Sequence, residues 1–182
     1  SPDITEEDIA AVTDVLRTGR LSLGPQLLAF EEAVASYAGS KHAVAVSNGT
    51  TALHLALATL RIGKGDEVLV STFTNMATFF AVLYQGATPI PIDCEMDTWN
   101  MDSSLLEKKI TSKTKAIMVV HIYGHPVDMD PVLAFAKKHN LFVIEDVAEA
   151  HGGDYRGKRL GSLGDIGCFS FYANKIIATG EG

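Results

Sequence analysis

The sequence predicts an α/β fold in which a mostly parallel central sheet carries helices on both faces. Short apolar runs of strand length alternate along the chain with longer segments in which apolar residues recur at helical spacing. Strands that are covered on both faces and separated by helices form parallel sheets with crossover connections. The strands are expected over 43–47, 67–72, 88–93, 116–122, 141–146 and 167–172.

The first helix has the clearest start signal. Thr5 is followed three residues later by Asp8, a pattern typical of a capped N-terminus, and Gly19 ends the apolar periodicity. Asp130 and Pro131 suit the N-cap and the first residue of a later helix. Three further helices are expected over 25–37, 50–60 and 74–84.

The composition is that of a soluble globular protein with one domain over residues 1–182. The chain has 47% hydrophobic and 20% charged residues, and its net charge of -7 with scattered basic residues disfavours nucleic-acid binding. No apolar run approaches the roughly 20 residues that a membrane-spanning helix needs. Cys94 and Cys168 lack metal-ligand spacing and no secretory leader is visible, so we expect reduced thiols and a cytoplasmic location.

Polar residues follow several of the predicted strands at the point where each strand ends. Asn48, Gly49 and Thr50 come after the first, residues 73–76 come after the second, and Asp146 ends another. Ligands of parallel sheets bind beyond the carboxyl ends of the strands. The sequence therefore predicts a ligand site at this edge of the sheet.

Two residues suit an aldehyde cofactor. Lys175 follows a buried strand and could bind the aldehyde covalently, while the carboxylate of Asp146 could keep a pyridine nitrogen protonated. Each has a plainer interpretation when taken alone, as a solvated lysine or as an aspartate that caps the next turn. Together they favour pyridoxal 5'-phosphate as the cofactor, with both residues catalytic.

A phosphate site is expected where the first predicted strand leads into a helix. Gly49 lets the backbone approach an anion, and Thr50 and Thr51 offer amides and hydroxyls at the positive helix end. Ser170, within the last predicted strand, supplies a further hydroxyl. The alternative is an ordinary helix start capped by Thr50 or Ser47. The candidate cofactor-binding residues here are Asn48, Gly49, Thr50, Thr51 and Ser170.

Five separated motifs resemble, in order, the DegT/DnrJ/EryC1/StrS family of sugar-nucleotide aminotransferases. The motifs are LSLGP (21–25), SNGTTALHLAL (47–57), DVAEAHG (146–152), SFYANK (170–175) and TGEG (179–182). Within the family, HIYGHPVDMDP (121–131) and FYANK are most similar to the perosamine synthase branch. Members of the family run on for about as many residues again, so we expect this chain to be an N-terminal fragment.

The resemblance implies a pyridoxal-phosphate-binding large domain of the aspartate-aminotransferase-like fold (fold type I), without the small C-terminal domain. It implies transfer of an amino group from L-glutamate to a nucleotide-linked keto sugar, a 4-keto-6-deoxyhexose in the perosamine branch. It also implies a homodimer with shared active sites, so the fragment alone is expected to be inactive. Lys175 stands where a dehydratase of the family has histidine, which favours transamination. Another enzyme of this fold and a non-catalytic cofactor-binding regulator are the alternatives.

The resemblance assigns further residues around the cofactor and the substrate. Glu149 falls near the ring hydroxyl of the cofactor, where the family usually has glutamine or histidine. Asn75 or Met76 would cover the ring face, although Met76 suits the core of a helix equally well. We expect no metal site, because no carboxylate stands in ligand register with the histidines of the HIYGH segment. The candidate substrate contacts are Ser22, His121 and Tyr123.

Overall fold

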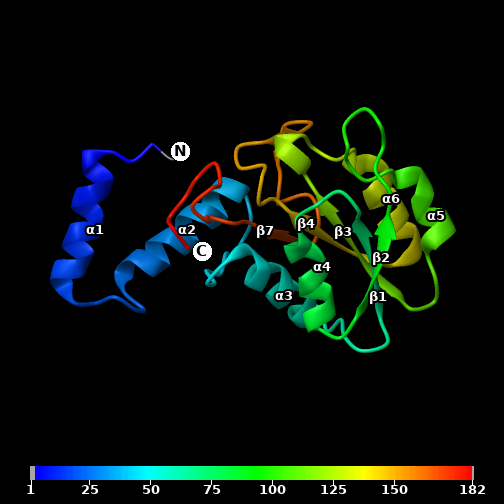
Figure 1. Ribbon diagram of the computed structural model, residues 1–182, viewed down its shortest axis with the longest axis horizontal. Helices are drawn as coiled ribbons and strands as arrows, with labels where there is room; N and C mark the ends of the chain where they lie inside the picture. Colours follow the sequence, from blue (N-terminus) through cyan, green and yellow to red (C-terminus); the bar gives the residue numbers. More distant parts are fainter. Residues whose placement is uncertain (1–2, 182) are drawn as a thin grey trace.

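The computed structural model describes residues 3–181, and its central element is a five-stranded parallel sheet. The strand order is β2-β1-β3-β4-β7 (Figure 1). The predicted fold class is therefore confirmed. The strands are β1 Glu67–Ser71, β2 Thr88–Ile92, β3 Thr114–Val120, β4 Phe142–Asp146 and β7 Ile166–Cys168.

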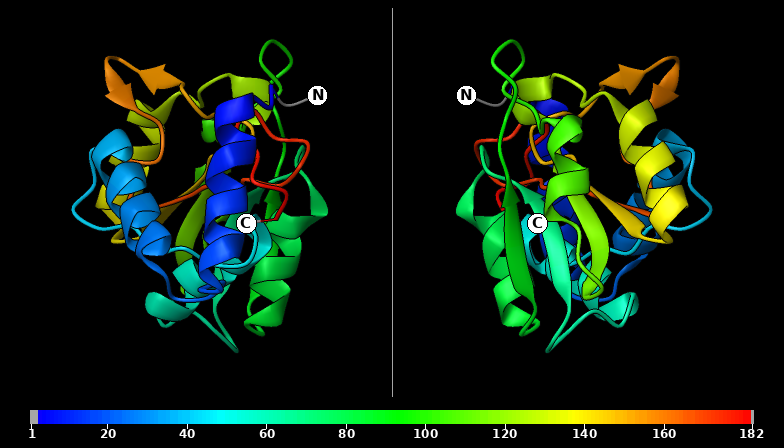
Figure 2. Two further views of the ribbon diagram at one scale, coloured as in Figure 1. Left: turned by 90° about the vertical axis from the view of Figure 1, so that its left-hand side faces the viewer. Right: turned by 90° about the vertical axis from the view of Figure 1, so that its right-hand side faces the viewer.

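Helices cover both faces of the sheet, because successive side chains of a strand point to opposite faces and here are apolar in both directions. Val68 and Ile144 belong to the core on one face, and Ile117 and Val143 belong to the core on the other. Figure 2 shows α4 and α6 on opposite sides of the sheet. The helices are α3 Gly49–Thr59 and α4 Met76–Tyr84 on the first face, and α5 Leu106–Lys109 and α6 Met129–His139 on the second.

Two helices precede the sheet, α1 (Glu6–Thr18) and α2 (Pro25–Ala38). Thr5 and Asp8 exchange the hydrogen bonds of a capping box, as the sequence predicts. The apolar face of α1 is exposed, and α1 lies beyond α2, away from the sheet (Figure 1). The short elements are η1 Ser103–Leu105, η2 Ile122–Gly124, β5 Asp154–Tyr155 and β6 Lys158–Arg159, of which the last two form a hairpin.

The first predicted strand, 43–47, has no place in the sheet that the structure describes. Its residues 43–46 line a cavity of about 680 Å³ that is also bordered by Phe169 and Phe171, beyond β7. The segment thus has the residues of a strand but no neighbouring strand to pair with. The prediction of a paired strand is wrong here, because an apolar run shows a preference for extended backbone and does not identify a partner.

The last strand and one helix start also differ from the expectation. The ladder of β7 ends at Cys168, so residues 169–172 leave the sheet and only Tyr172 forms an isolated bridge, with Gly180. The N-cap of α6 is Asp128 and not Asp130, which makes Pro131 the third residue of the helix. Proline is tolerated there because the first amides of a helix have no acceptor within it.

Two glycines, Gly161 and Gly167, allow β7 to pack closely against the loop that precedes it. A methyl group on Gly167 would overlap the backbone of Gly161. We therefore expect Gly167→Ala to lower the free energy of unfolding by about 1–3 kcal/mol, the usual effect of overpacking. The control is Gly63→Ala, where the nearest atom to an added methyl group is the Gln85 carbonyl oxygen at 3.4 Å. Urea unfolding measures both variants, and equal losses would contradict this packing.

Candidate active site

The carboxyl edge of the sheet gathers most of the predicted site residues on the face covered by α3 and α4. Asp146 is the last residue of β4, and its side chain lies on the same face as that of Ile144 because side chains alternate along a strand. Thr78 of α4 contacts Asp146 from this face, and Gly49 at the start of α3 contacts Ser170. Residues far apart in the sequence thus meet at the predicted ligand edge.

Gly49 and Ser170 lie so close that a side chain at position 49 would clash. A Cβ atom on Gly49 would lie 2.8 Å from the Ser170 Cβ atom and 3.2 Å from Ser170 Oγ. Ser170 is itself buried, with 5% of its surface exposed. The absence of a side chain at Gly49 lets the Ser170 hydroxyl lie against the first turn of α3, whose positive end favours an anion.

Asn48 is the N-cap of α3, so the alternative in which Thr50 or Ser47 caps the helix is wrong. The Asn48 Oδ1 atom accepts hydrogen bonds from the Thr51 amide at 2.8 Å and from Thr51 Oγ1 at 2.9 Å. The first amides of a helix have no acceptor within it, and this cap satisfies only that of Thr51. The amides of Gly49 and Thr50 remain to bind an anion.

Asp146 is a buried carboxylate held by two donors. Its Oδ2 atom accepts a hydrogen bond from Thr78 Oγ1 at 2.9 Å, and its Oδ1 atom accepts one from the Ala148 amide at 3.1 Å. Burial raises the pKa of Asp146, and the two hydrogen bonds and the charge of Lys175 offset only part of this effect. A cationic N–H group that faces such a carboxylate gains more than it would in water.

Lys175 and Glu149 form an ion pair in the same region. Lys175 Nζ lies 3.8 Å from Glu149 Oε1, and the side chain of Lys175 is 16% exposed. Glu149 Oε2 accepts a hydrogen bond from the Tyr123 amide at 3.1 Å. Because the charges of Lys175 and Glu149 both act on the Asp146 carboxyl, the amine and the two carboxylates share one site.

An aromatic cluster of Phe73, Trp99 and Tyr123 adjoins this site. The ring centroid of Phe73 lies 5.2 Å from that of Trp99 and 5.9 Å from that of Tyr123. Trp99 and Tyr123 are exposed and have left-handed backbone angles, with φ of 63° and 50°. Such strained positions concentrate at functional sites. Tyr123 is predicted from the sequence but Trp99 is not, because residues on separate loops share no spacing.

Asn75 and Met76 stand at the start of α4. Asn75 is the N-cap, and its Oδ1 atom accepts a hydrogen bond from the Ala77 amide at 3.0 Å. Met76 is 55% exposed, so the alternative in which it belongs to the helix core is wrong. Its thioether side chain is therefore free to contact a ligand at the carboxyl edge.

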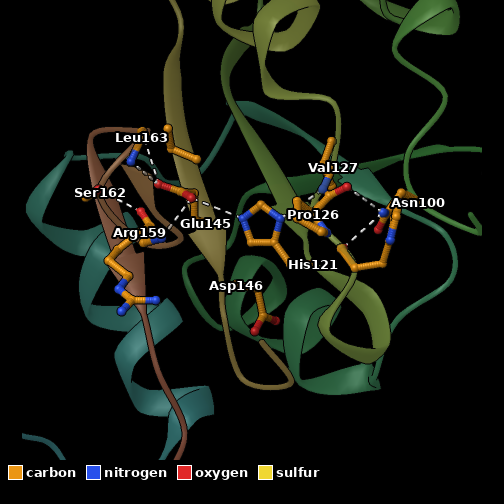
Figure 3. Close-up of polar contacts among 12 residues, drawn as sticks. Asn100, His121, Pro126, Val127, Glu145, Asp146, Arg159, Ser162 and Leu163 are labelled. Atoms are coloured by element: carbon orange, nitrogen blue, oxygen red, sulfur yellow. Dashed lines mark hydrogen bonds and ion pairs between the residues drawn. The ribbon is translucent and has the colours of Figure 1, made fainter. Parts of the chain in front are cut away.

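His121 is not part of this group. Its side chain is fully buried, and Figure 3 shows its ring between Glu145 and Val127. Nδ1 accepts a hydrogen bond from the Val127 amide at 3.1 Å, so the ring proton is on Nε2, which donates to Glu145 Oε2 at 3.0 Å. The predicted substrate contact at His121 is wrong, because both ring nitrogens are bonded inside the protein.

Glu145 is the centre of this buried network. Its oxygens also accept hydrogen bonds from the amides of Gly161, Leu163 and Gly164, at 2.9, 2.7 and 2.7 Å. Burial by itself raises the pKa of Glu145, but the hydrogen bonds from His121 and the amides outweigh it, and the pKa lies below its ordinary value. Figure 3 shows the side chain of Asp146 pointing away from this network.

Ser22 also lies apart from the assembled site. It is exposed in the link between α1 and α2. Within the described part of the chain, no hydrogen bond or ion pair joins its side chain to another predicted site residue. Its role as a substrate contact stays a prediction. Gly182, the last residue of the TGEG motif, lies outside the described residues.

Metal sites, membrane-spanning helices and reactive thiols were also sought in the described residues. Over residues 3–181, no three His, Cys, Asp or Glu side chains are arranged to hold a metal ion. None of the helices described here is long and apolar enough to cross a membrane. Both cysteines are free thiols, and burial raises the pKa of Cys168 far above its ordinary value, which makes it a poor nucleophile.

The sequence matches a known family over almost its full length. The model of the DegT/DnrJ/EryC1/StrS aminotransferase family matches residues 2–182. GDP-perosamine synthase of Caulobacter vibrioides is 56% identical over 161 residues, which cover 88% of this chain and 43% of that protein. The chain belongs to the DegT/DnrJ/EryC1/StrS aminotransferase family, as its motifs indicate.

Solved structures of similar proteins have the same fold. An aminotransferase from Psychrobacter cryohalolentis matches with a TM-score of 0.97 at 43% identity, over 100% of this chain and 47% of that chain. GDP-4-keto-6-deoxy-D-mannose-3-dehydratase of E. coli, solved with bound hydrated PLP, matches with a TM-score of 0.94 at 30% identity. The match covers 100% of this chain and 48% of that chain. The expected aspartate-aminotransferase-like fold is confirmed, and the chain spans about half the length of these relatives.

The adjacent carboxyl groups of Glu145 and Asp146 have opposite effects on the pH dependence of stability. The pKa of Glu145 is lowered in the fold, so its stabilisation is present above the unfolded pKa and is lost as the pH falls through the folded pKa. The pKa of Asp146 is raised in the fold, so its ionisation destabilises the protein as the pH rises from the unfolded pKa through the folded pKa.

We therefore expect Glu145→Gln to lower the free energy of unfolding at neutral pH by about 3–5 kcal/mol, because it breaks a buried charged network. Asp146→Asn removes a buried charge and keeps the shape of the side chain, so this variant without cofactor should be at least as stable as the wild type. Urea unfolding across the acidic and neutral range measures both. Equal destabilisation by the two substitutions would contradict the assignment.

Proposed function

We propose that residues 1–182 are the pyridoxal-phosphate-binding large domain of a sugar-nucleotide aminotransferase. The reaction is the transfer of an amino group from L-glutamate to a nucleotide-linked keto sugar. The observation that carries this proposal is the meeting of the Lys175 amine, the buried Asp146 carboxylate and the Gly49–Ser170 contact at one sheet edge. These groups fit the aldehyde, the ring nitrogen and the phosphate of pyridoxal phosphate.

Each of these residues then has a defined role. Gly49, Thr50 and Ser170 bind the phosphate, and Asp146 keeps the ring nitrogen protonated. When bound, pyridoxal phosphate supplies an aldehyde that takes up nitrogen and a ring that withdraws electrons. Lys175 holds the cofactor covalently and, once its Nζ is free, carries a proton. Glu149 keeps Lys175 close to the turn that contains Tyr123.

The proposed acceptor is a 4-keto-6-deoxyhexose linked to a nucleotide. The name of the Caulobacter vibrioides relative supports this choice, since it is a GDP-perosamine synthase. The aromatic cluster of Phe73, Trp99 and Tyr123 supports it as well, because its two exposed rings, Trp99 and Tyr123, can pack against a sugar or a base. A homodimer with shared active sites and a cytoplasmic location complete the proposal, on the resemblance to the family.

Dehydration of the sugar is the rival reaction, because the E. coli dehydratase shares this fold. The residue at position 175 discriminates between the two reactions. The resemblance implies histidine at this place in a dehydratase, whereas this chain has lysine. An amine that can hold the cofactor covalently favours the transfer of nitrogen.

The first test maps the lysine that binds the cofactor. We expect borohydride reduction of the chain with pyridoxal phosphate, followed by peptide mapping, to place the modification at Lys175. Lys175→Arg should abolish it because the guanidinium does not react, and Lys64→Arg, at an exposed position, should not change it. Modification spread evenly over surface lysines would contradict the proposed site.

The second test measures the reaction in a chimera that has the length of the relatives. Residues 1–182 replace the matching part of the Caulobacter vibrioides GDP-perosamine synthase, and L-glutamate and a GDP-linked 4-keto-6-deoxy sugar are supplied. We expect an amino sugar and 2-oxoglutarate, and a loss of turnover of about 10²-fold or more in Lys175→Arg. Loss of the sugar hydroxyl without uptake of nitrogen would establish the dehydratase, and cofactor labelling without reaction with glutamate would indicate a regulator.

A further inference from the structure

Thr78 links Asp146 to a second hydroxyl group. The Thr78 side chain is 0% exposed, and its Oγ1 atom donates to Asp146 Oδ2 at 2.9 Å. Thr74 Oγ1 lies 2.7 Å from Thr78 Oγ1. The two threonines are four residues apart in the sequence, so the turn that opens α4 brings them to the same face.

When Asp146 is ionised, the donor and the acceptor of each hydrogen bond between Thr74, Thr78 and Asp146 are fixed. A carboxylate only accepts, so the single hydroxyl hydrogen of Thr78 is used by Asp146. The Thr78 oxygen must then accept from Thr74, which makes Thr74 the outer donor. The reverse order needs a protonated Asp146, and a protonated carboxyl would not stabilise a cationic ring nitrogen.

The Asp146 carboxylate is held from two separate elements. Thr78 of α4 holds Oδ2, and the Ala148 amide in the segment after β4 holds Oδ1. Donors on both oxygens fix the rotation of the carboxylate plane. A threonine inside a helix can donate its hydroxyl to a carbonyl of the preceding turn or point to solvent. The Thr78 hydroxyl instead crosses to another element, although valine would fill the same volume.

We propose that Thr78 is a positioning residue that, with Thr74 behind it, holds the Asp146 carboxylate ionised and correctly oriented toward a pyridine nitrogen. The inference rests on the proposed function, because it assigns Asp146 to the ring of the cofactor. It adds to that function a pair of hydroxyl groups that contact neither the cofactor nor the substrate in the proposed reaction.

The charged surroundings of Asp146 explain why such support is needed. Burial and the charge of Glu149 raise the pKa of Asp146, and Lys175 acts in the opposite direction. The thiol of Cys168 lies on the adjacent strand β7, where burial raises its own pKa and keeps it neutral. Thr78 and Ala148 supply the hydrogen bonds that favour the ionised form.

The test compares Thr78→Val with Thr78→Ser. We expect the pKa of Asp146, measured by carbon NMR in the chain without cofactor, to rise in Thr78→Val and to stay at the wild-type value in Thr78→Ser. The dissociation constant of pyridoxal phosphate, measured by absorbance, should rise about tenfold or more in Thr78→Val, because a hydrogen bond to a charged group is lost. Thr78→Ser should restore affinity to within about twofold of the wild type.

A double-mutant cycle separates positioning from packing. If Thr78 acts through the carboxylate, Thr78→Val should have no further effect on cofactor affinity in an Asp146→Asn background. An unchanged Asp146 pKa in Thr78→Val, or the same loss of affinity in both backgrounds, would overturn the inference while leaving the labelling of Lys175 intact. If labelling of Lys175 fails in the wild type, the proposed function fails, and the NMR comparison still decides whether Thr78 controls Asp146.

Discussion

The buried carboxylate of Glu145 is the interaction on which the carboxyl edge of the sheet depends. It accepts hydrogen bonds from His121 at the end of β3 and from the amides of Gly161, Leu163 and Gly164 ahead of β7. A buried charge is costly unless donors fill its lone pairs, and here both oxygens are filled. Because β4 lies between β3 and β7, the Glu145 side chain links three neighbouring strands at the carboxyl edge of the sheet.

The pleat of β4 turns the next residue, Asp146, to the opposite face. Glu145 therefore stabilises the fold from one side while Asp146 serves the site on the other. Burial destabilises the ionised form of Asp146, and Thr78 and Ala148 compensate only in part. A cofactor with a protonated ring nitrogen would supply the missing positive charge. Binding the cofactor would therefore offset the cost of burying the ionised Asp146 carboxylate.

The sequence predicted much of this arrangement, because the fold and the main site residues have local signatures. The apolar runs of β1, β3 and β4 needed no tertiary information. Asp146 ends β4, Ser170 follows β7, and Gly49 opens α3. His121 was misassigned because a polar ring after a strand has the same local pattern whether it faces solvent or a buried glutamate. Thr78 carried no signal at all, since its partner lies 68 residues away. Pairing across the sheet is a long-range property, which is also why the strand predicted over 43–47 was wrong.

The two borders of the sheet differ in what they offer to another polypeptide. On the β2 side, Pro89 and Pro91 lack N–H groups, and proline in a strand is confined to an unpaired edge, so this border cannot complete a ladder with an incoming strand. On the β7 side, the border opens on the apolar cavity lined by residues 43–46 and contains no proline. The sheet can therefore be extended by another strand at one edge only. A further strand can add next to β7, whereas edge-to-edge aggregation through β2 is blocked by the chemistry of its backbone.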